Sequence, residues 1–199
     1  MAPITHLLAS WIVAAKTTDN LRDRRLVTLA GVAPDLDGLG IILDIANGSF
    51  ARGHLYYYPQ YHHWLMHGLP AALVCSAVLA AFGRRRWHVF ALAFIVFHLH
   101  LLCDLVGSRG PGADDFWPIF YFGPLSQHPM WIWKYQWGLD AWPNRLITVA
   151  LFGWALWLAV KRGDSFVGVF SRRVDRVFVG VLRKWCSETG LAGKMGLTF

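Results

Sequence analysis

The chain has 199 residues, of which 55% are hydrophobic and 16% are charged. This balance excludes an intrinsically disordered chain, because disorder combines low hydrophobicity with high charge. So few charges also disfavour a soluble globular protein of this length, which makes a membrane protein the leading class. The net charge of +7 would suit nucleic acid or anionic lipid. The apolar excess favours membrane lipid as the partner, and no nucleic acid is expected.

Three apolar segments predict the longer helices. Residues 64–82 carry no formal charge and as a helix would extend about 28 Å, enough for the core of a bilayer. Residues 87–106 are also long enough, but they include His100 and Asp104, and such groups in hydrocarbon are costly unless they have a function. The third segment, residues 146–160, is shorter, so its helix must tilt, thin the bilayer or lie partly in the interface.

The two ends of the chain differ from this apolar middle. The N-terminal apolar runs, residues 4–15 and 26–33, are too short to span a bilayer alone. Residues 166–185 place apolar side chains at helical spacing and five basic side chains on the other faces. This pattern predicts a helix that lies on an anionic membrane surface. An amphipathic helix that caps a soluble core is the alternative.

The segments between the apolar runs predict loops and a membrane interface. Residues 44–61 are expected to be a loop, and residues 107–145 are rich in Gly, Pro and aromatic rings, which favour the level of the lipid headgroups. The predicted fold is therefore all-α: a membrane-embedded helical bundle with short N-terminal helices, about three longer apolar helices and a C-terminal amphipathic helix. We expect residues 1–163 to form the membrane-embedded domain and residues 164–199 the basic amphipathic helix and tail.

Basic residues gather in three clusters beside the apolar segments. Lys and Arg next to short apolar segments tend to stay in the cytoplasm, which predicts an orientation. Counting helix ends alternately then places His6, the pair Asp35 and Asp37, residues 62–67 and residues 98–104 together at the non-cytoplasmic end. The three basic clusters are Arg22, Arg24 and Arg25; Arg84, Arg85 and Arg86; and Lys161 with Arg162.

Histidines and aspartates supply the candidate chemistry. His100 and Asp104 are four residues apart, so on a helix they share a face and can grip one cation. His98 lies roughly 200° from His100 around the helix and cannot share that face. A buried hydrogen-bonded pair is the commoner explanation of such a spacing, but its place in a predicted span favours function.

Three further segments carry groups of the same kind. His63 and His67 are expected on one helical face, with His62 reaching back from the preceding turn, although histidines at an interface are an even alternative. Asp35 and Asp37 follow an apolar run in a turn that contains Pro34 and Gly38, where a solvated turn or a helix cap would be the ordinary reading. An isolated N-terminal histidine, His6, is uninformative alone, and it gains weight only through the predicted convergence.

The remaining candidates are weaker. His54, His88 and His128 lack matched partners, and we expect surface, interface or supporting positions for them, with His128 the nearest to the site. Glu188, the sole glutamate, lies in the C-terminal tail. Cys75, Cys103 and Cys186 are odd in number and widely spaced, which favours neither a disulfide framework nor a C-x-x-C zinc site.

In order along the chain stand Thr5-His6, Pro34-Asp35-Leu36-Asp37, His62 with His67, and His100 with Asp104, followed by Gly107 and Gly110. Over roughly the first 110 residues this order resembles the YdjM-type membrane-bound metal-dependent hydrolases, which are distantly similar to zinc-dependent phospholipase C. The sequence departs from the family pattern at three positions, none of which is a ligand in that pattern. These are His63 in place of Arg, Met66 in place of Thr, and Gly68 in place of Ser.

The resemblance implies a helical bundle with a cluster of imidazoles and carboxylates, and hydrolysis of a phosphoester or lipid-like amphiphile by a metal-activated water. Nitrogen and oxygen ligands without thiolate suit one to three divalent ions, with zinc the first choice and manganese or iron the others. Asp35 or Asp104 would bridge two cations, and Asp35 and Asp37 are the candidate catalytic carboxylates, Asp37 as general base or further ligand. The candidate metal ligands are His6, Asp35, His62, His67, His100 and Asp104.

Other functions fit parts of the pattern. A membrane di-iron oxygenase or desaturase would use His63 and His67, but such enzymes are dominated by histidines, and the aspartates would be surplus. A haem-binding helix bundle would use one histidine from each of two spans as axial ligands. A non-enzymatic scaffold or metal carrier would only bind the ion. The site is predicted on the non-cytoplasmic side of a bacterial inner membrane, and the sequence leaves the oligomeric state open.

Overall fold

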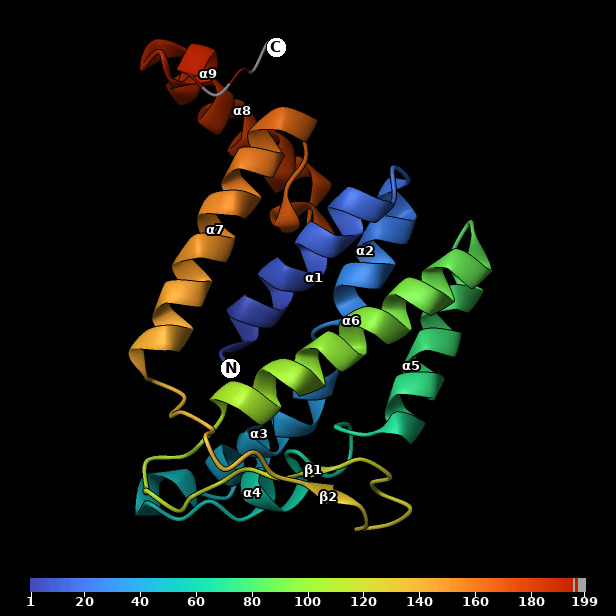
Figure 1. Ribbon diagram of the computed structural model, residues 1–199, viewed down its shortest axis with the longest axis vertical. Coiled ribbons are helices and arrows are strands. Elements are labelled where there is room, and N and C mark those ends of the chain that lie inside the picture. Colours follow the sequence, from blue (N-terminus) through green and yellow to red (C-terminus); the bar gives the residue numbers. More distant parts are fainter. Residues whose placement is uncertain (195, 197–199) are drawn as a thin grey trace.

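The computed structural model describes residues 1–194 and 196, and this part of the chain is mainly helical (Figure 1). The prediction of an all-α fold is therefore confirmed. Among the described residues, β structure is limited to one antiparallel pair, in which Ile119 lies opposite Trp131, and an isolated bridge between Arg109 and Gly138. Five helices form the bundle: α1 (Pro3–Thr17), α2 (Leu21–Ala30), α5 (Leu69–Ala81), α6 (Arg86–Gly107) and α7 (Trp142–Arg162).

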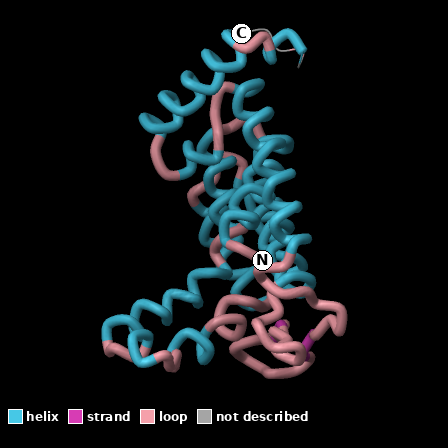
Figure 2. The backbone as a smooth tube through the Cα atoms, turned by 90° about the vertical axis from the view of Figure 1, so that its left-hand side faces the viewer, coloured by secondary structure: helices cyan, strands magenta, loops and turns pink. Residues whose placement is uncertain are grey.

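The remaining elements lie at the two ends of the long axis (Figure 1). Figure 2 shows most of the loops gathered with the two short strands at the end opposite the C-terminus. That end contains η1 (Pro34–Leu39), α3 (Gly40–Ala46), η2 (Phe50–Arg52), α4 (Tyr57–Tyr61), β1 (Ile119–Phe120) and β2 (Met130–Trp131). The other end contains η3 (Phe166–Val169), α8 (Arg172–Glu188) and α9 (Leu191–Lys194).

Small residues let the central helices approach one another closely. Ala14 of α1, Ala30 of α2 and Ala93 of α6 are fully buried in one apolar cluster. A second cluster packs Trp11 of α1 against Ala155 and neighbouring residues of α7. Removing such apolar side chains from water is the main favourable contribution to the free energy of folding. It also fixes α1, α2 and α6 as the rigid frame behind the polar residues.

Within residues 1–194 and 196, two helices are long and apolar enough to cross a membrane. They are α6, with 22 residues, and α7, with 21 residues. A third span is formed if α2 and residues Pro34–Ala46 are taken together, although this pair is bent by 59°. The 13 residues of α5 would extend only about 20 Å.

The predicted span at residues 64–82 is therefore wrong at its start. The helix begins only at Leu69, and residues 62–68 form a turn. Non-local hydrogen bonds hold this turn: the backbone N–H of Met66 donates to Asp37, and the backbone N–H of Leu69 donates to Tyr121 O. Gly68 is required at its end, because a Cβ atom there would lie 2.8 Å from Tyr121 O.

Two other boundaries also differ from the prediction. The helix expected at residues 146–160 begins at Trp142, with Pro143 in its first turn, and runs to Arg162. It is thus long enough without the tilting or thinning that we expected. Residues 44–61, expected to be a loop, contain α4, η2 and the end of α3. Asp44 explains part of this order, since its buried carboxylate accepts hydrogen bonds from the backbone N–H groups of Tyr56, Tyr57 and Tyr58.

The C-terminal helix α8 presents an apolar stripe to its surroundings. Val177 is 65% exposed and Val181 is 62% exposed, while Asp175, Val179 and Cys186 of the same helix are buried. The helix therefore packs through one side and leaves a second apolar side uncovered. The exposed apolar stripe consists of Phe170, Val174, Val177, Val181 and Trp185.

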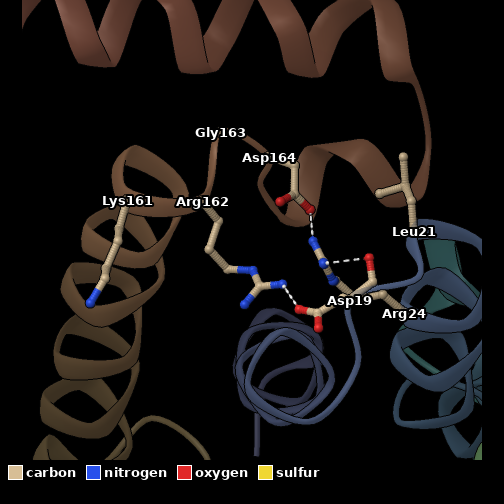
Figure 3. A pocket seen from close by; sticks show the side chains of 7 residues that line it. All are labelled: Asp19, Leu21, Arg24, Lys161, Arg162, Gly163 and Asp164. Carbon is tan, nitrogen blue, oxygen red and sulfur yellow. Dashed lines mark hydrogen bonds and ion pairs between the residues drawn. The ribbon is translucent and has the colours of Figure 1, made fainter. Parts of the chain in front are cut away.

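Ion pairs close the end of the bundle that carries α8. Around a cavity there, Arg24 pairs with Asp164, and Arg162 Nη2 lies 3.0 Å from Asp19 Oδ1 (Figure 3). These pairs connect α2 and the turn before it to the end of α7. The basic clusters lie at this end and the candidate ligand histidines at the other, as the alternation of helix ends predicts, while His88 lies at the basic end beside Thr17.

Candidate metal centre

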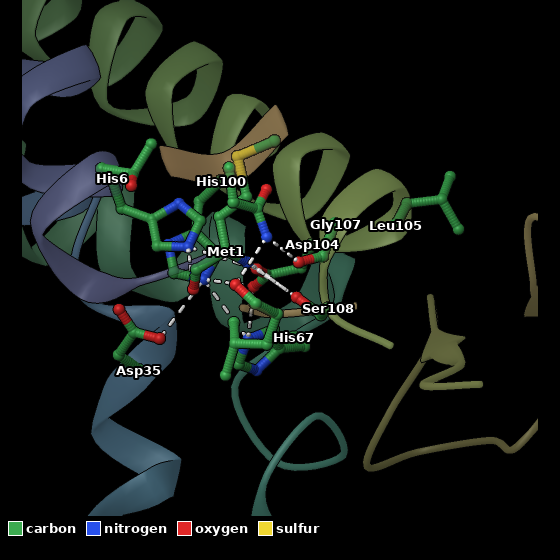
Figure 4. A network of polar contacts seen from close by, with 12 residues as sticks. Met1, His6, Asp35, His67, His100, Asp104, Leu105, Gly107 and Ser108 are labelled. Atoms are coloured by element: carbon green, nitrogen blue, oxygen red, sulfur yellow. Dashed lines mark hydrogen bonds and ion pairs between the residues drawn. The ribbon is translucent and has the colours of Figure 1, made fainter. Parts of the chain in front are cut away.

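The pair His100 and Asp104 on α6 forms the middle of the polar cluster in Figure 4. Both side chains are buried, and His100 Nε2 lies 2.9 Å from Asp104 Oδ2, as the four-residue spacing predicts. His100 Nδ1 donates to Gly31 O at 2.9 Å. Because a carbonyl oxygen only accepts, a neutral His100 would present the lone pair of Nε2 to the Asp104 carboxylate. Two acceptors at this distance require a proton or a metal ion between them.

Gly31 makes this arrangement possible. It follows α2, and a Cβ atom at this position would lie 1.7 Å from Ser10 Oγ on α1. A side chain is therefore excluded where α1 and α2 meet. The backbone carbonyl that orients His100 depends on that close approach.

Four further groups converge on Asp104. His6 Nε2 on α1 lies 3.2 Å from Asp104 Oδ1, and the His6 ring stacks on His100 with 3.7 Å between ring centroids. His67 Nε2 lies 3.4 Å from Asp104 Oδ2. The Met1 ammonium group forms an ion pair with Asp104, and Ser108 Oγ donates to the same carboxylate at 2.7 Å. The cluster therefore already accommodates a cationic group.

Asp35 and Asp37 lie on the short helix η1 but make different contacts. Asp35 Oδ1 is 3.7 Å from His100 Nε2, and its buried Oδ2 atom has no hydrogen-bond partner. Asp37 is fully engaged: Oδ1 accepts from His62 Nδ1 at 2.7 Å, and Oδ2 accepts from His67 Nδ1 at 2.9 Å and from Met66 N at 3.0 Å. Both imidazoles are thereby turned so that Nε2 is available for other contacts.

Two sets of ligand atoms result. The atoms of each set lie within 4.8 Å of one another, as the donors around a metal ion do. We call the first the inner group and the second the cavity group. The inner group is His6, Asp35, His100 and Asp104, and the cavity group is His62, His63 and His67.

The charges around His67 outweigh its burial. Burial alone would lower the pKa of His67, but hydrogen bonds to Asp104 and Asp37 raise the pKa to about 9. Burial lowers the pKa of His63 well below its usual range, and the neighbouring His67 adds to this effect. Two imidazoles in the same turn thus have pKa values shifted in opposite directions, upward for His67 and downward for His63.

A cavity of about 680 Å³ adjoins both groups. Asp35 and Asp104 of the inner group and His62 and His63 of the cavity group line it. Apolar and polar side chains together form the remaining wall. These include Leu39, Tyr58, Ser108, Arg109, Pro111, Trp117 and Leu139.

The structure brings all six candidate ligands and Asp37 to one end of the molecule. The expectation that His63 and His67 share a helical face is wrong, because both lie in the turn before α5, yet that turn brings their rings into a stack. His98 faces away, as predicted, and contacts Phe94 O and Tyr121. His128 is exposed, one of the positions expected for it, and its backbone N–H donates to Ser126 Oγ at 3.1 Å.

Other residues of the site were not found from the sequence. Arg109 lies between Gly107 and Gly110 of the motif order but was not singled out, and Trp117 lies beyond residue 110, where no motif was found. Contacts distant in sequence bring Trp117 to the cavity. Gln136 holds this stretch against α6, because its amide donates to Asp104 O and Trp117 O and accepts from Trp117 N. For His63, which was not among the six candidate ligands, the sequence did offer a signal, because it lies next to His62 and four residues before His67.

These features define an α-helical membrane protein with a buried centre of imidazole and carboxylate groups. The model of the YdjM inner membrane protein family matches residues 1–174, and the chain therefore belongs to that family. The family and the apolar helices together identify an integral membrane protein. No curated protein and no solved structure matches the chain.

Proposed function

We propose that this protein is a metal-dependent hydrolase of a bacterial inner membrane that acts on a phosphoester or lipid-like substrate. The observation that carries the proposal is the convergence of the inner group and the cavity group beside one cavity. A structural polar network would pair its donors with acceptors. Here His100 Nδ1 donates to Gly31 O, so the Nε2 lone pair of a neutral His100 meets two carboxylate oxygens, Asp104 Oδ2 at 2.9 Å and Asp35 Oδ1 at 3.7 Å.

The donor set fits a divalent cation. Its donor atoms are imidazole nitrogens and carboxylate oxygens, which suit zinc first and manganese or iron next. The inner group of His6, Asp35, His100 and Asp104 would hold it. Asp35 would take part through Oδ1, which lies 3.7 Å from His100 Nε2, and this leaves its Oδ2 atom without a partner. A bound cation of this kind polarises a phosphoryl oxygen and makes water a nucleophile near neutral pH.

The two catalytic candidates have different roles in this proposal. Asp35 lines the cavity and has an oxygen without a hydrogen-bond partner, so it can accept a proton from water. Both oxygens of Asp37 are engaged by His62, His67 and Met66. We assign Asp37 the positioning of two imidazoles and Asp35 the part of general base.

The cavity wall supports an amphiphilic substrate with an anionic group. Arg109 offers positive charge beside the carboxylates, and its Nε atom is buried without a hydrogen-bond partner. Leu39 leads from the cavity wall into α3, where Ile42 and Ile45 are exposed. An apolar tail could thus reach lipid while the phosphoryl group meets Arg109. The basic clusters support an orientation with this site toward the non-cytoplasmic side.

Elemental analysis of the detergent-purified chain, with an absorption spectrum and assays on a generic phosphodiester and on phospholipid, tests the proposal. We expect zinc or manganese, no visible band, and turnover. Asp104→Asn should lose metal and turnover together, because it removes the central negative charge. His98→Gln, outside both groups, is the control.

Each other result would contradict the proposal. A Soret band would indicate a haem protein, iron with oxygenase chemistry would indicate a di-iron enzyme, and absence of metal would indicate a scaffold. Bound metal without turnover of any phosphoester would indicate a metal carrier and not a hydrolase. Full metal occupancy in Asp104→Asn would refute the ligand assignment.

A further inference from the structure

His63 has the backbone conformation of a glycine. Its φ angle is +67°, and it is the one residue other than glycine with a positive φ in the part of the chain that the structure describes. The left-handed region is unfavourable for a residue with a Cβ atom. Such conformations persist where the surrounding structure imposes them, and they concentrate at functional sites.

This conformation places the His63 ring among other rings. The ring stacks on His67 with 4.3 Å between centroids and an interplanar angle of 12°, and its centroid lies 4.6 Å from that of Trp117. The side chain is buried, and its Nδ1 atom has no hydrogen-bond partner. A buried polar atom without a partner is costly. An apolar side chain would fill the same space without that cost, so packing alone does not account for a histidine here.

We infer that His63 is a metal ligand and that it completes, with His62 and His67, a second cation site that opens to the cavity. The ligand atoms of these three residues lie within 4.8 Å of one another. Asp37 holds Nδ1 of both His62 and His67, so Nε2 is the remaining ligand nitrogen of each ring. The inference rests on the metal-binding part of the proposed function and is independent of hydrolysis.

The two cation sites have different positions relative to the cavity. His6 and His100 of the inner group are buried and do not line it, whereas His62 and His63 do. His67 lies between the groups, since its Nε2 atom is 3.4 Å from Asp104 Oδ2 and its ring contacts His63. Substitution of His63 should therefore remove only the cation of the cavity group, while substitution of Asp104 should remove the cation of the inner group.

The test counts metal ions on the full chain in detergent after equilibration with Zn²⁺ and removal of excess. We expect two zinc ions per chain for the unchanged protein and one for His63→Gly. Glycine accepts the φ of +67° without strain, so the turn can keep its backbone path. Free imidazole should then restore the second ion, because it can occupy the space that the side chain has left.

The matched control is His54→Gly, at an exposed loop position, which should keep both ions. If His63→Gly does not fold, His63→Asn replaces it, because asparagine tolerates the left-handed region and lacks the imidazole. Ligand-field bands of Co²⁺-substituted protein give a second measurement, which should change in His63→Gly and return with imidazole.

The outcomes separate this inference from the proposed function. Two ions in His63→Gly, or failure of imidazole to restore a lost ion, would overturn the inference alone. One ion in the unchanged protein would also overturn it and leave the inner group intact. Absence of any metal would overturn both proposals. Two ions with the expected loss and rescue, but without phosphoester turnover, would support the inference and refute the hydrolase.

Discussion

The position of Asp37 between two imidazoles leads to a quantitative prediction. Its carboxylate accepts from His62 Nδ1 at 2.7 Å and from His67 Nδ1 at 2.9 Å. In Asp37→Asn one oxygen becomes an NH₂ group, which cannot accept from either ring. One charge-assisted hydrogen bond, about 1.5–3 kcal/mol, is then lost, and metal affinity should fall about 10- to 150-fold. This agrees with the roughly 10- to 100-fold cost of losing a group that orients a metal ligand.

The affinity is measured by titrating the detergent-solubilised chain against a zinc-binding fluorescent chelator. Asp23→Asn is a matched control, because Asp23 is also a fully buried carboxylate but accepts from the backbone N–H groups of Arg84 and Arg85. It should leave zinc affinity unchanged. If Asp37→Asn abolishes turnover at unchanged zinc affinity, Asp37 is the general base and its positioning role is refuted.

Two other properties follow from the same structure. A chelator should lower the melting temperature of the chain, because a cation at 100 times its Kd stabilises the folded state by about 2.7 kcal/mol; an unchanged melting curve by differential scanning fluorimetry would count against a metal centre. The exposed apolar stripe of α8, flanked by Arg172, Arg173, Arg176 and Lys184, should lie on anionic lipid. In nanodiscs, trypsin should therefore cut α8 more slowly with phosphatidylglycerol than with phosphatidylcholine. High salt should reduce that difference, and equal cleavage rates in the two lipids would contradict the surface location.

The helix α6 shows what sequence periodicity can predict. The apolar run at residues 87–106 differs from the observed helix Arg86–Gly107 by one residue at each end. Within such a helix, the spacing alone determines that His100 and Asp104 share a face and that His98 does not. That His6 and Asp35 lie at the same end as this pair was predicted by counting alternate helix ends along the chain. This count needs only the positions of the connections between helices and of the basic clusters.

The turn at residues 62–68 shows what periodicity cannot predict. Trp64, Leu65 and Met66 continue the apolar run of α5, so hydrophobicity alone does not mark a break before Leu69. Gly68 at the N-cap and Pro70 in the first turn were the local signal for a helix start. The break depends on Asp37, on Tyr121 O and on the close approach at Gly68, which all come from other parts of the chain. The same is true of Arg109 and Trp117, because a loop reveals its neighbours only after the helices have assembled.

The segment between α6 and α7, together with the first turn of α7, helps to hold the centre and also forms part of the cavity wall. The last carbonyls of α6 have no partners within the helix. Gln136 donates to Asp104 O and Leu105 O, and Asn144 donates to Gly107 O. Side chains from outside α6 thus donate hydrogen bonds to the carbonyl groups of its last turn, which carries Asp104. Because the same loop supplies Arg109 and Trp117 to the cavity, the wall that would contact a substrate and the carboxylate that would hold a cation are fixed to one another by hydrogen bonds.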